Sequence, residues 1–178
     1  MLAKGEDRTV HRVRKSLNVR RTKETEFLEV HRFIRSIDWL ENYPKHMYKI
    51  LLRYFGNTCF IAENEQEEII GFVLGFKSQR HTDTYFLWQI GIHPSYQNEG
   101  LGAWLLSEIE KGLRSDDFEK IEVTVDPENL PSRKLFERLN YKNVSQKEGK
   151  IVELEGIPAV KDYYKPGRHF ILYEKAID

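Results

Sequence analysis

An apolar strand, a glycine-containing loop and an amphipathic helix follow one another without interruption between residues 84 and 113. Residues 84–92 are almost wholly apolar, which predicts a strand in the middle of a sheet. Pro94 turns the chain, and apolar residues at helical spacing predict a helix over 101–113. Gly100 and Gly102 remove side chains where a ligand must approach the backbone closely. The free N–H groups of a first helical turn lie at the positive end of its dipole, so this arrangement favours phosphate or pyrophosphate binding.

Three kinds of phosphate-binding loop can be compared with this segment. The nucleoside-triphosphate loop needs Lys followed by Ser or Thr after its last glycine, and neither follows Gly102. The dinucleotide fingerprint needs a third glycine at the position of Leu105. The pattern Gln/Arg-x-x-Gly-x-Gly/Ala is met by the run that starts at Gln97, Gln-Asn-Glu-Gly-Leu-Gly. The sequence alone also allows an ordinary strand–turn–helix with two glycines.

The remaining hydrophobic pattern predicts a mixed α/β chain. We expect strands at residues 16–21, 57–63, 68–77, 120–125 and 169–174, with a hairpin turn at 64–67. Helices are expected after an N-cap at Thr22, over 42–54 and over 131–139. In the helix over 42–54 the expected inward stripe consists of Met47, Ile50, Leu51 and Tyr54. Strands that first pair locally and then cross through helices indicate a mixed sheet with helices on both faces.

Charge and composition narrow the function classes. The chain has 178 residues, 28 basic and 28 acidic, so the formal net charge is zero, which argues against a nucleic-acid coat or an anionic-membrane binder. Residues 1–24 carry eight basic and three acidic side chains, a net +5, and the rest carries −5. We expect residues 1–15 to be a flexible basic N-terminal extension and 16–178 to be a single domain. A nucleic-acid arm and a tail that docks on an acidic surface are the alternatives for the extension.

Cysteine and histidine content gives three further expectations. The single cysteine, Cys59, lies in an apolar run and is expected to be a buried hydrophobe, and it precludes an internal disulfide. The six histidines lack metal-ligand spacing, so no metal is expected. No long apolar run and no signal-peptide pattern is present, so we expect no membrane span and a cytoplasmic location.

A second segment makes the loop pattern more specific. Residues 123–129 (Val-Thr-Val-Asp-Pro-Glu-Asn), Ser132 and residues 135–141 (Leu-Phe-Glu-Arg-Leu-Asn-Tyr) form a strand, a loop and a helix. Together with the run from Gln97, they resemble the GNAT superfamily of acetyl-CoA-dependent N-acetyltransferases, over about residues 17–175. The resemblance implies a mixed, mainly antiparallel central sheet of six to seven strands with helices on both faces.

A narrower resemblance is to the diaminobutyrate acetyltransferases. It rests on Thr58-Cys59, on residues 86–90 (Phe-Leu-Trp-Gln-Ile) and on several residues between Glu122 and Phe136. The chain departs from that branch at residues 41–44 (Glu-Asn-Tyr-Pro) and around residues 163–170. Both departures concern the acceptor side, and the cofactor side follows the pattern.

The resemblance implies roles for individual residues. Residues expected to bind acetyl-CoA are Ile90, Gly91, Ile92, Gln97, Asn98, Glu99, Gly100, Leu101, Gly102, Ala103, Asn129, Ser132 and Phe136. Residues expected to face the acceptor amine are Trp39, Glu41, Tyr43, Asp83 and Gln89. Gln89 lies where many relatives place a Glu base, and an amide cannot take that role, so Glu122 is the candidate base. Phe136 lies where relatives often have a Tyr acid, so Tyr164 and Tyr141 are the candidate acids, with Tyr163 as an alternative to Tyr164.

Three functions are compatible with these features. The first is transfer of an acetyl group from acetyl-CoA to a primary amine of a small molecule, an amino acid or a diamine, in a ternary complex. The second uses a protein N-terminus or a lysine as the acceptor, and the third is a non-catalytic CoA-binding module. The expected partners are a small amine and no nucleic acid or membrane, and a homodimer is left open.

Overall fold

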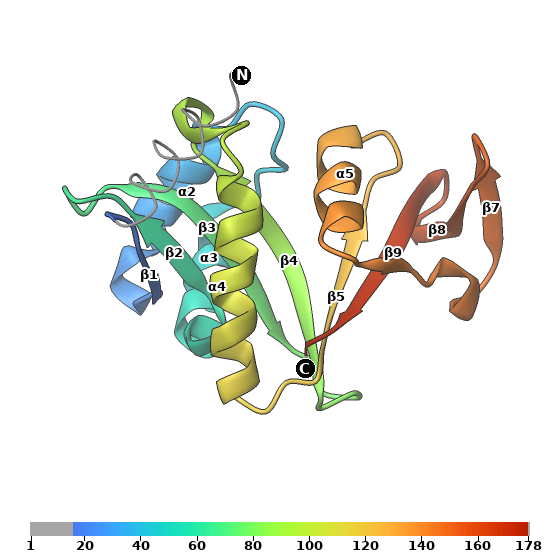
Figure 1. Ribbon diagram of the computed structural model, residues 1–178, viewed down its shortest axis with the longest axis horizontal. Helices are drawn as coiled ribbons and strands as arrows, with labels where there is room; N and C mark the ends of the chain where they lie inside the picture. The colour runs from blue at the N-terminus through green and yellow to red at the C-terminus, as the bar shows by residue number, and fades with distance from the viewer. Residues whose placement is uncertain (1–15, 178) are drawn as a thin grey trace, which may run out of the picture. The chain divides into compact units, whose positions relative to one another are not determined.

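The computed structural model describes residues 16–177, which contain nine strands, four α-helices and four short 3-10 segments (Figure 1). The predicted basic extension, residues 1–15, lies outside the described residues. Clustering of contacts divides the chain into two compact units. The first contains residues 16–75 and Gln89–Ile109, and the second contains Phe76–Trp88 and residues 110–177. Strands β3 and β4 and helix α4 each contribute residues to both.

The first unit is built on strands β1 (Asn18–Arg21), β2 (Phe60–Glu63), β3 (Ile69–Lys77) and β4 (Thr84–Ile92), adjacent in that order. The pairs β1–β2 and β2–β3 are antiparallel. Its helices are α2 (Phe27–Arg35), α3 (Lys45–Phe55) and the first part of α4 (Leu101–Ser115), with 3-10 turns at Glu24–Glu26, Gly56–Thr58 and Pro94–Tyr96.

Helices cover both faces of the sheet in the first unit. A Cβ at Gly71 of β3 would lie 3.3 Å from Cδ2 of Leu105 in α4. The next residue, Phe72, packs edge-on against Phe33 of α2, with ring centroids 5.9 Å apart. Because consecutive residues of a strand point to opposite faces, α4 and α2 lie on opposite sides of β3, as Figure 1 also shows. The fold class expected from the sequence is confirmed.

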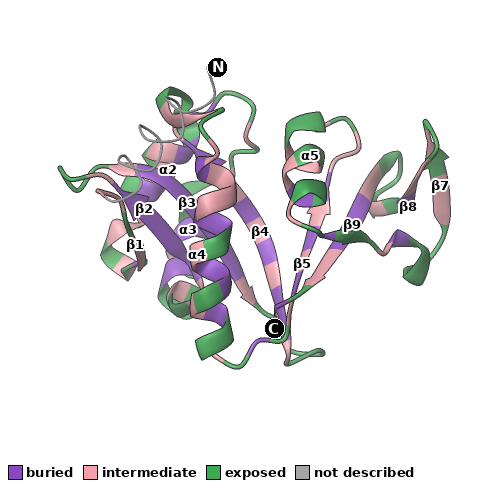
Figure 2. Ribbon diagram, viewed as in Figure 1, coloured by how far each residue is buried: buried purple, intermediate pink, exposed green. Residues whose placement is uncertain are grey.

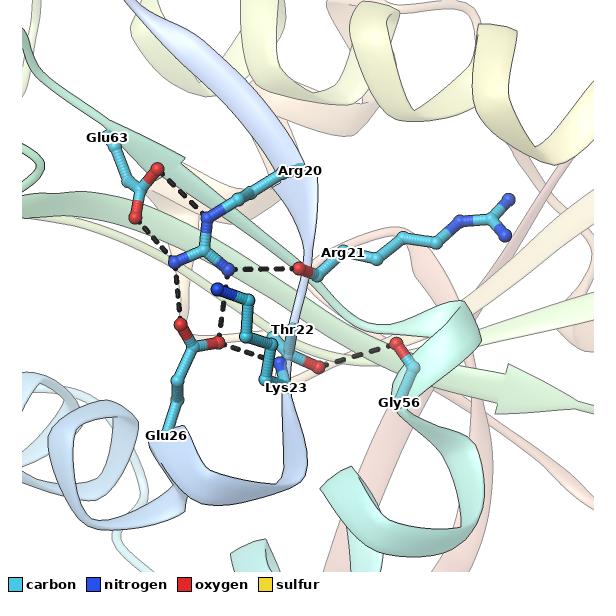
Figure 3. A network of polar contacts seen from close by, with 7 residues as sticks. All are labelled: Arg20, Arg21, Thr22, Lys23, Glu26, Gly56 and Glu63. Carbon is cyan, nitrogen blue, oxygen red and sulfur yellow. Dashed lines mark hydrogen bonds and ion pairs between the residues drawn. The ribbon is translucent and has the colours of Figure 1, made fainter.

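The edge strand β1 is attached by an arginine network (Figure 3). The guanidinium of Arg20 donates to both carboxylate oxygens of Glu63 in β2, at 3.0 and 2.6 Å, and to both of Glu26, at 3.1 and 2.6 Å. These hydrogen bonds outweigh partial burial and raise the pKa of Arg20. The Thr22 hydroxyl donates to the Gly56 carbonyl at 3.4 Å, so the predicted N-cap role of Thr22 is wrong. The N–H of Lys23 donates instead to Glu26, at 2.7 Å, and Glu26 therefore caps this helical start.

The second unit contains β5 (Lys120–Val125), α5 (Leu130–Arg138), β6 (Lys142–Asn143), β7 (Ile151–Leu154), β8 (Ile157–Lys165) and β9 (Arg168–Ala176), with a 3-10 turn at Ser145–Lys147. The order is β4-β5-β9-β8-β7, and β6 pairs with β9. Strands β4 and β5 are parallel, and β5–β9, β8–β9 and β7–β8 are antiparallel. A parallel pair needs a crossover connection, which α4 supplies along the chain.

Three strands, β6, β7 and β8, were not expected from the sequence. Buried residues fill β2, β3 and most of β4, whereas β7 and most of β8 are half-buried or exposed (Figure 2). Their apolar alternation is therefore weak. The turn between β7 and β8 is Glu155–Gly156, with φ of 50° and 79°, and the type I′ hairpin turn requires such positive values. This Glu-Gly pair between Leu154 and Ile157 is the local signal that the prediction missed.

The inward face of α3 also differs from the prediction. The buried residues are Tyr48, Leu51 and Leu52, whereas Met47 and Ile50 are exposed. Apolar residues occur on several faces of this helix, so helical periodicity fits either stripe.

Candidate active site

The segment after β4 folds back onto the end of that strand. His93 Nδ1 accepts from the N–H of Ser95 at 3.2 Å, so His93 is a turn residue, as expected. The Gln97 side chain donates from Nε2 to the carbonyl of Ile92 at 2.9 Å. Gln97 therefore anchors the loop, and its amide nitrogen bonds to backbone.

Two left-handed residues shape the loop before α4. Asn98 has φ of 63° and Gly100 has φ of 74°. Glycine takes such a conformation without steric cost, and Asn is among the side chains that tolerate it best. Asn98 and Glu99 are exposed, whereas Leu101 is buried and fixes the start of the helix in the core.

The first turn of α4 offers backbone donors. The N–H of Trp104 donates to the Gly100 carbonyl at 3.1 Å, so those of Leu101, Gly102 and Ala103 precede the first intrahelical bond. Such donors at the positive end of a 15-residue helix suit a phosphate group. The geometry of residues 97–103 fits the expected pyrophosphate loop, with the anion bound by backbone.

Gly91 owes its identity to packing. A Cβ at Gly91 would lie 2.6 Å from Cε1 of Phe72 and 3.0 Å from Cδ1 of Ile37, distances that leave no room for a side chain. The sequence allowed close packing against a tryptophan, and Phe72 and Ile37 occupy the space. Gln89 and Ile92 are buried and Ile90 is half-buried.

Three residues expected to face the acceptor meet around a tyrosine that was not expected. Gln89 donates from Nε2 to the carbonyl of Glu41 at 2.7 Å and accepts at Oε1 from the hydroxyl of Tyr48 at 3.3 Å. The N–H of Tyr43 donates to the same hydroxyl at 3.3 Å. Burial raises the pKa of Tyr48, and the nearby carboxylate of Glu41 adds to this effect. Trp39, in the same connection, is 55% exposed.

Glu122, the candidate base, lies in an ion cluster of the second unit. Its Oε1 is 3.0 Å from Lys120 Nζ, which also lies 2.9 Å from Glu174. Partial burial opposes the charge of Lys120, but the hydrogen bonds to Glu174 and Glu122 outweigh it and raise the pKa of Lys120. A base at Glu122 therefore has to act beside a protonated lysine, which favours the carboxylate form.

Tyr164, a candidate acid, reaches the same strand. Its hydroxyl lies 2.8 Å from the hydroxyl of Thr124, and its side chain is 58% exposed. Thr124 and Glu122 are two residues apart on β5 and therefore point to the same face. The structure thus brings Tyr164 to the face of β5 that carries Glu122. Burial, together with the neighbouring Tyr164, raises the pKa of Tyr163 to about 12.

Tyr141 and Phe136 lie in the core of the second unit. The Tyr141 hydroxyl donates to Glu110 at 3.4 Å, and Glu110 also pairs with Lys175 at 2.8 Å. Burial raises the pKa of Tyr141. The Phe136 ring is 1% exposed and packs 5.0 Å from that of Tyr141. This placement favours structural roles for both, in contrast to the expected proton donor and cofactor contact.

The other expected residues of the second unit lie at turns. Asn129 caps α5, accepting from the N–H of Ser132 at 3.1 Å. The Asp83 carboxylate accepts from the Thr84 hydroxyl at 2.9 Å, and the Asp83 carbonyl accepts from the N–H of Glu119. These contacts show local roles for Asn129 and Asp83 beside the expected ones.

Comparison with known proteins decides the family. The Acetyltransferase (GNAT) family matches residues 26–141, about two thirds of the chain and including the loop at 97–103. This chain is a GNAT acetyltransferase family member. The L-2,4-diaminobutyric acid acetyltransferase of Shouchella clausii (strain KSM-K16) is 33% identical over 100 residues, which cover 56% of each protein. The chain therefore aligns with little more than half the length of that relative.

Two further similarities extend over more of the chain. The L-2,4-diaminobutyric acid acetyltransferase of Chromohalobacter salexigens is 29% identical over 133 residues, 75% of this chain and 69% of that protein. Among solved structures, the diaminobutyrate acetyltransferase EctA from Paenibacillus lautus, in complex with L-2,4-diaminobutyric acid and coenzyme A, has a TM-score of 0.67 and 25% identity. That match covers 90% of this chain and 95% of the other.

Two searches of residues 16–177 of this GNAT protein bear on the excluded classes. No group of three or more His, Cys, Asp or Glu side chains there has an arrangement able to hold a metal ion. Within the same residues, every helix is too short or too polar to cross a bilayer.

Burial confirms the expectation for the cysteine. Cys59 is fully buried, and its thiol lies 3.5 Å from the carbonyl of Gly75. Desolvation raises its pKa to about 12, so the thiol stays protonated and is not a nucleophile.

Proposed function

We propose that this chain transfers the acetyl group of acetyl-CoA to an amine of L-2,4-diaminobutyric acid. The observation that carries the proposal is the similarity to EctA from Paenibacillus lautus, which covers 95% of a protein solved with that amino acid and coenzyme A. The curated relatives carry the same enzyme name. The loop at 97–103 supports the cofactor side, because its geometry suits a pyrophosphate.

The proposed reaction is a direct attack in a ternary complex. The acceptor amine loses a proton, its nitrogen forms a bond to the acetyl carbonyl carbon, the carbon–sulfur bond breaks and the thiolate takes up a proton. Acetyl-CoA supplies the activated acetyl group. The backbone N–H groups of Leu101, Gly102 and Ala103 would bind its pyrophosphate, and holding both reactants replaces a rare bimolecular encounter.

The proton-transfer groups stay predictions. Glu122 is the candidate base and Tyr164 the candidate acid, and their support is that both reach one face of β5. Gln89 has no role in proton transfer, because a neutral amide does not accept a proton near neutral pH. A cytoplasmic location, a homodimer and the absence of a nucleic-acid or membrane partner also stay predictions.

An acceptor screen tests the proposal. Purified protein is mixed with acetyl-CoA and one acceptor at a time: L-2,4-diaminobutyric acid, shorter and longer diamino acids, polyamines, single amino acids and peptides. We expect release of free thiol to be fastest with L-2,4-diaminobutyric acid, after subtraction of a reaction without acceptor. Transfer to peptides alone would indicate a protein acetyltransferase. Binding of coenzyme A without thiol release for any acceptor would indicate a non-catalytic binding module.

A further inference from the structure

The connection between α2 and α3 lies on the inner part of β4 at two positions. Gln89 and Gly91 are two residues apart, so they point to the same face of that strand. At Gly91 the missing side chain makes room for Ile37, whose Cδ1 would be 3.0 Å from a Cβ. At Gln89 the side-chain amide binds the carbonyl of Glu41 at 2.7 Å. Strand β4 therefore forms a seat for residues 37–43, which we call the acceptor segment.

Tyr48 completes the attachment from the first turns of α3. Its side chain is fully buried, its hydroxyl donates to Gln89 Oε1 and it accepts from the N–H of Tyr43, both at 3.3 Å. A hydroxyl has one proton and two lone pairs, so both contacts can form at once. Gln89 and Tyr48 thus bind two backbone groups of the acceptor segment, the carbonyl of Glu41 and the N–H of Tyr43.

We propose that Gln89 and Tyr48 are positioning residues, which hold the acceptor segment in the conformation that binds the amino-acid acceptor. This inference rests on the proposed function. The segment exposes Trp39 and the carboxylate of Glu41. A fixed carboxylate attracts an acceptor with a second ammonium group, so the pair acts on acceptor binding without touching the acceptor.

The hydrogen bonds separate this role from that of a displaced base. Both polar atoms of the Gln89 amide bond within the protein, at 2.7 and 3.3 Å. A glutamate at position 89 would place a carboxylate oxygen against the Glu41 carbonyl, and two acceptors repel. Glutamine is therefore the residue that this seat requires.

Tyr48→Phe is the primary test, because it removes the hydroxyl and keeps the ring. We expect the KM for L-2,4-diaminobutyric acid to rise about fivefold to tenfold, the loss of one or two buried hydrogen bonds, with kcat within about twofold of the unmodified protein. The Kd of coenzyme A should not change. Gln89→Glu should raise the same KM further. The matched controls are Tyr54→Phe, at a 68% exposed tyrosine of the same helix, and Gln66→Glu, at an exposed turn residue, and neither should change KM.

A spectroscopic readout keeps the test independent of activity. The difference in emission between each protein and its Trp39→Phe counterpart isolates Trp39, and we expect Tyr48→Phe and Gln89→Glu to increase its quenching by acrylamide. Unchanged Trp39 emission in both variants would overturn the inference. So would a fall in kcat at constant KM, or a faster Gln89→Glu enzyme with a new acidic limb in its pH–rate profile. If the unmodified protein transfers no acetyl group, the proposed function fails, and the emission measurement still decides on the seat.

Discussion

Helices α4 and α5 both follow a strand and a short loop, but they begin differently. The α5 helix begins with Asn129, whose side chain accepts from the N–H of Ser132 at 3.1 Å. The α4 helix follows Gly100, which has no side chain to cap it and has φ of 74°. The start of α5 satisfies one of its own donors, whereas the start of α4 presents its donors to a ligand. The difference shows how one type of connection serves stability in one unit and anion binding in the other.

The largest expected effect is on the start of α4. In Gly100→Val a β-branched residue would have to adopt a left-handed conformation, which displaces the first helical turn. We expect coenzyme A affinity measured by calorimetry to fall on the order of 100-fold, equivalent to about 3 kcal/mol.

A second glycine provides the control for that variant. Gly156 has φ of 79° and nothing lies within 4 Å of an added Cβ, so Gly156→Val introduces similar backbone strain in the β7–β8 turn. It should lose stability and retain coenzyme A affinity. Equal affinity of the Gly100→Val protein and the unmodified one would refute the assignment of the loop.

The start of α5 should respond in stability. Asn129→Ala removes the cap, and we expect the free energy of unfolding in urea to fall by about 1 kcal/mol, with Asn129→Asp recovering it. The same pair tests the predicted cofactor contact. Asp keeps the cap and adds a negative charge, so coenzyme A affinity should fall in Asn129→Asp if that contact exists. A stability of Asn129→Ala equal to that of the unmodified protein would show that the cap contributes nothing.

Asn98 should have a smaller effect than Asn129. Its φ of 63° is tolerated by Asn and less so by Ala, so Asn98→Ala should lower the free energy of unfolding by about 0.5 kcal/mol. Asn143, half of the short strand β6, is an exposed asparagine that lacks a positive φ. A stabilised Asn98→Ala protein in thermal unfolding would contradict the strain expected here.

The smallest expected effect concerns charge. Glu99 is exposed beside the start of α4, where a negative charge competes with a phosphate. We expect Glu99→Gln to tighten coenzyme A binding about twofold to threefold at low salt, a gain that salt screening reduces. Glu65→Gln, in the exposed turn before β3, is the control and should leave affinity unchanged. Weaker binding by Glu99→Gln would mean that Glu99 contributes to the site.

Much of the fold was predictable because its signals are local. The bounds of β4 and β5 agree with the prediction, since apolar runs bounded by turn residues define buried strands without further context. Strands β7 and β8 were missed because their side chains are half-buried or exposed and backbone pairing stabilises them. The count of nine strands therefore exceeds the expected six to seven.

The candidate site divides in the same way. The loop from Gln97 to Ala103 was identified from its glycines, and its geometry fits that reading. Tyr48 was missed, because residues 47, 48, 50, 51 and 54 of its helix are all apolar or aromatic. Two inward stripes fit this pattern equally well, and only the packing of α3 shows that Tyr48 is buried.

The sequence by itself determined the strand–loop–helix at residues 84–113 and the resemblance to acetyltransferases, because both depend on neighbouring residues. Tertiary structure decided which polar groups meet. The bond between Tyr48 and Gln89 joins residues 41 apart in the chain, and no local pattern specifies such a contact. Folding also enclosed Phe136 and Tyr141 in one core, since burial depends on what packs around a side chain.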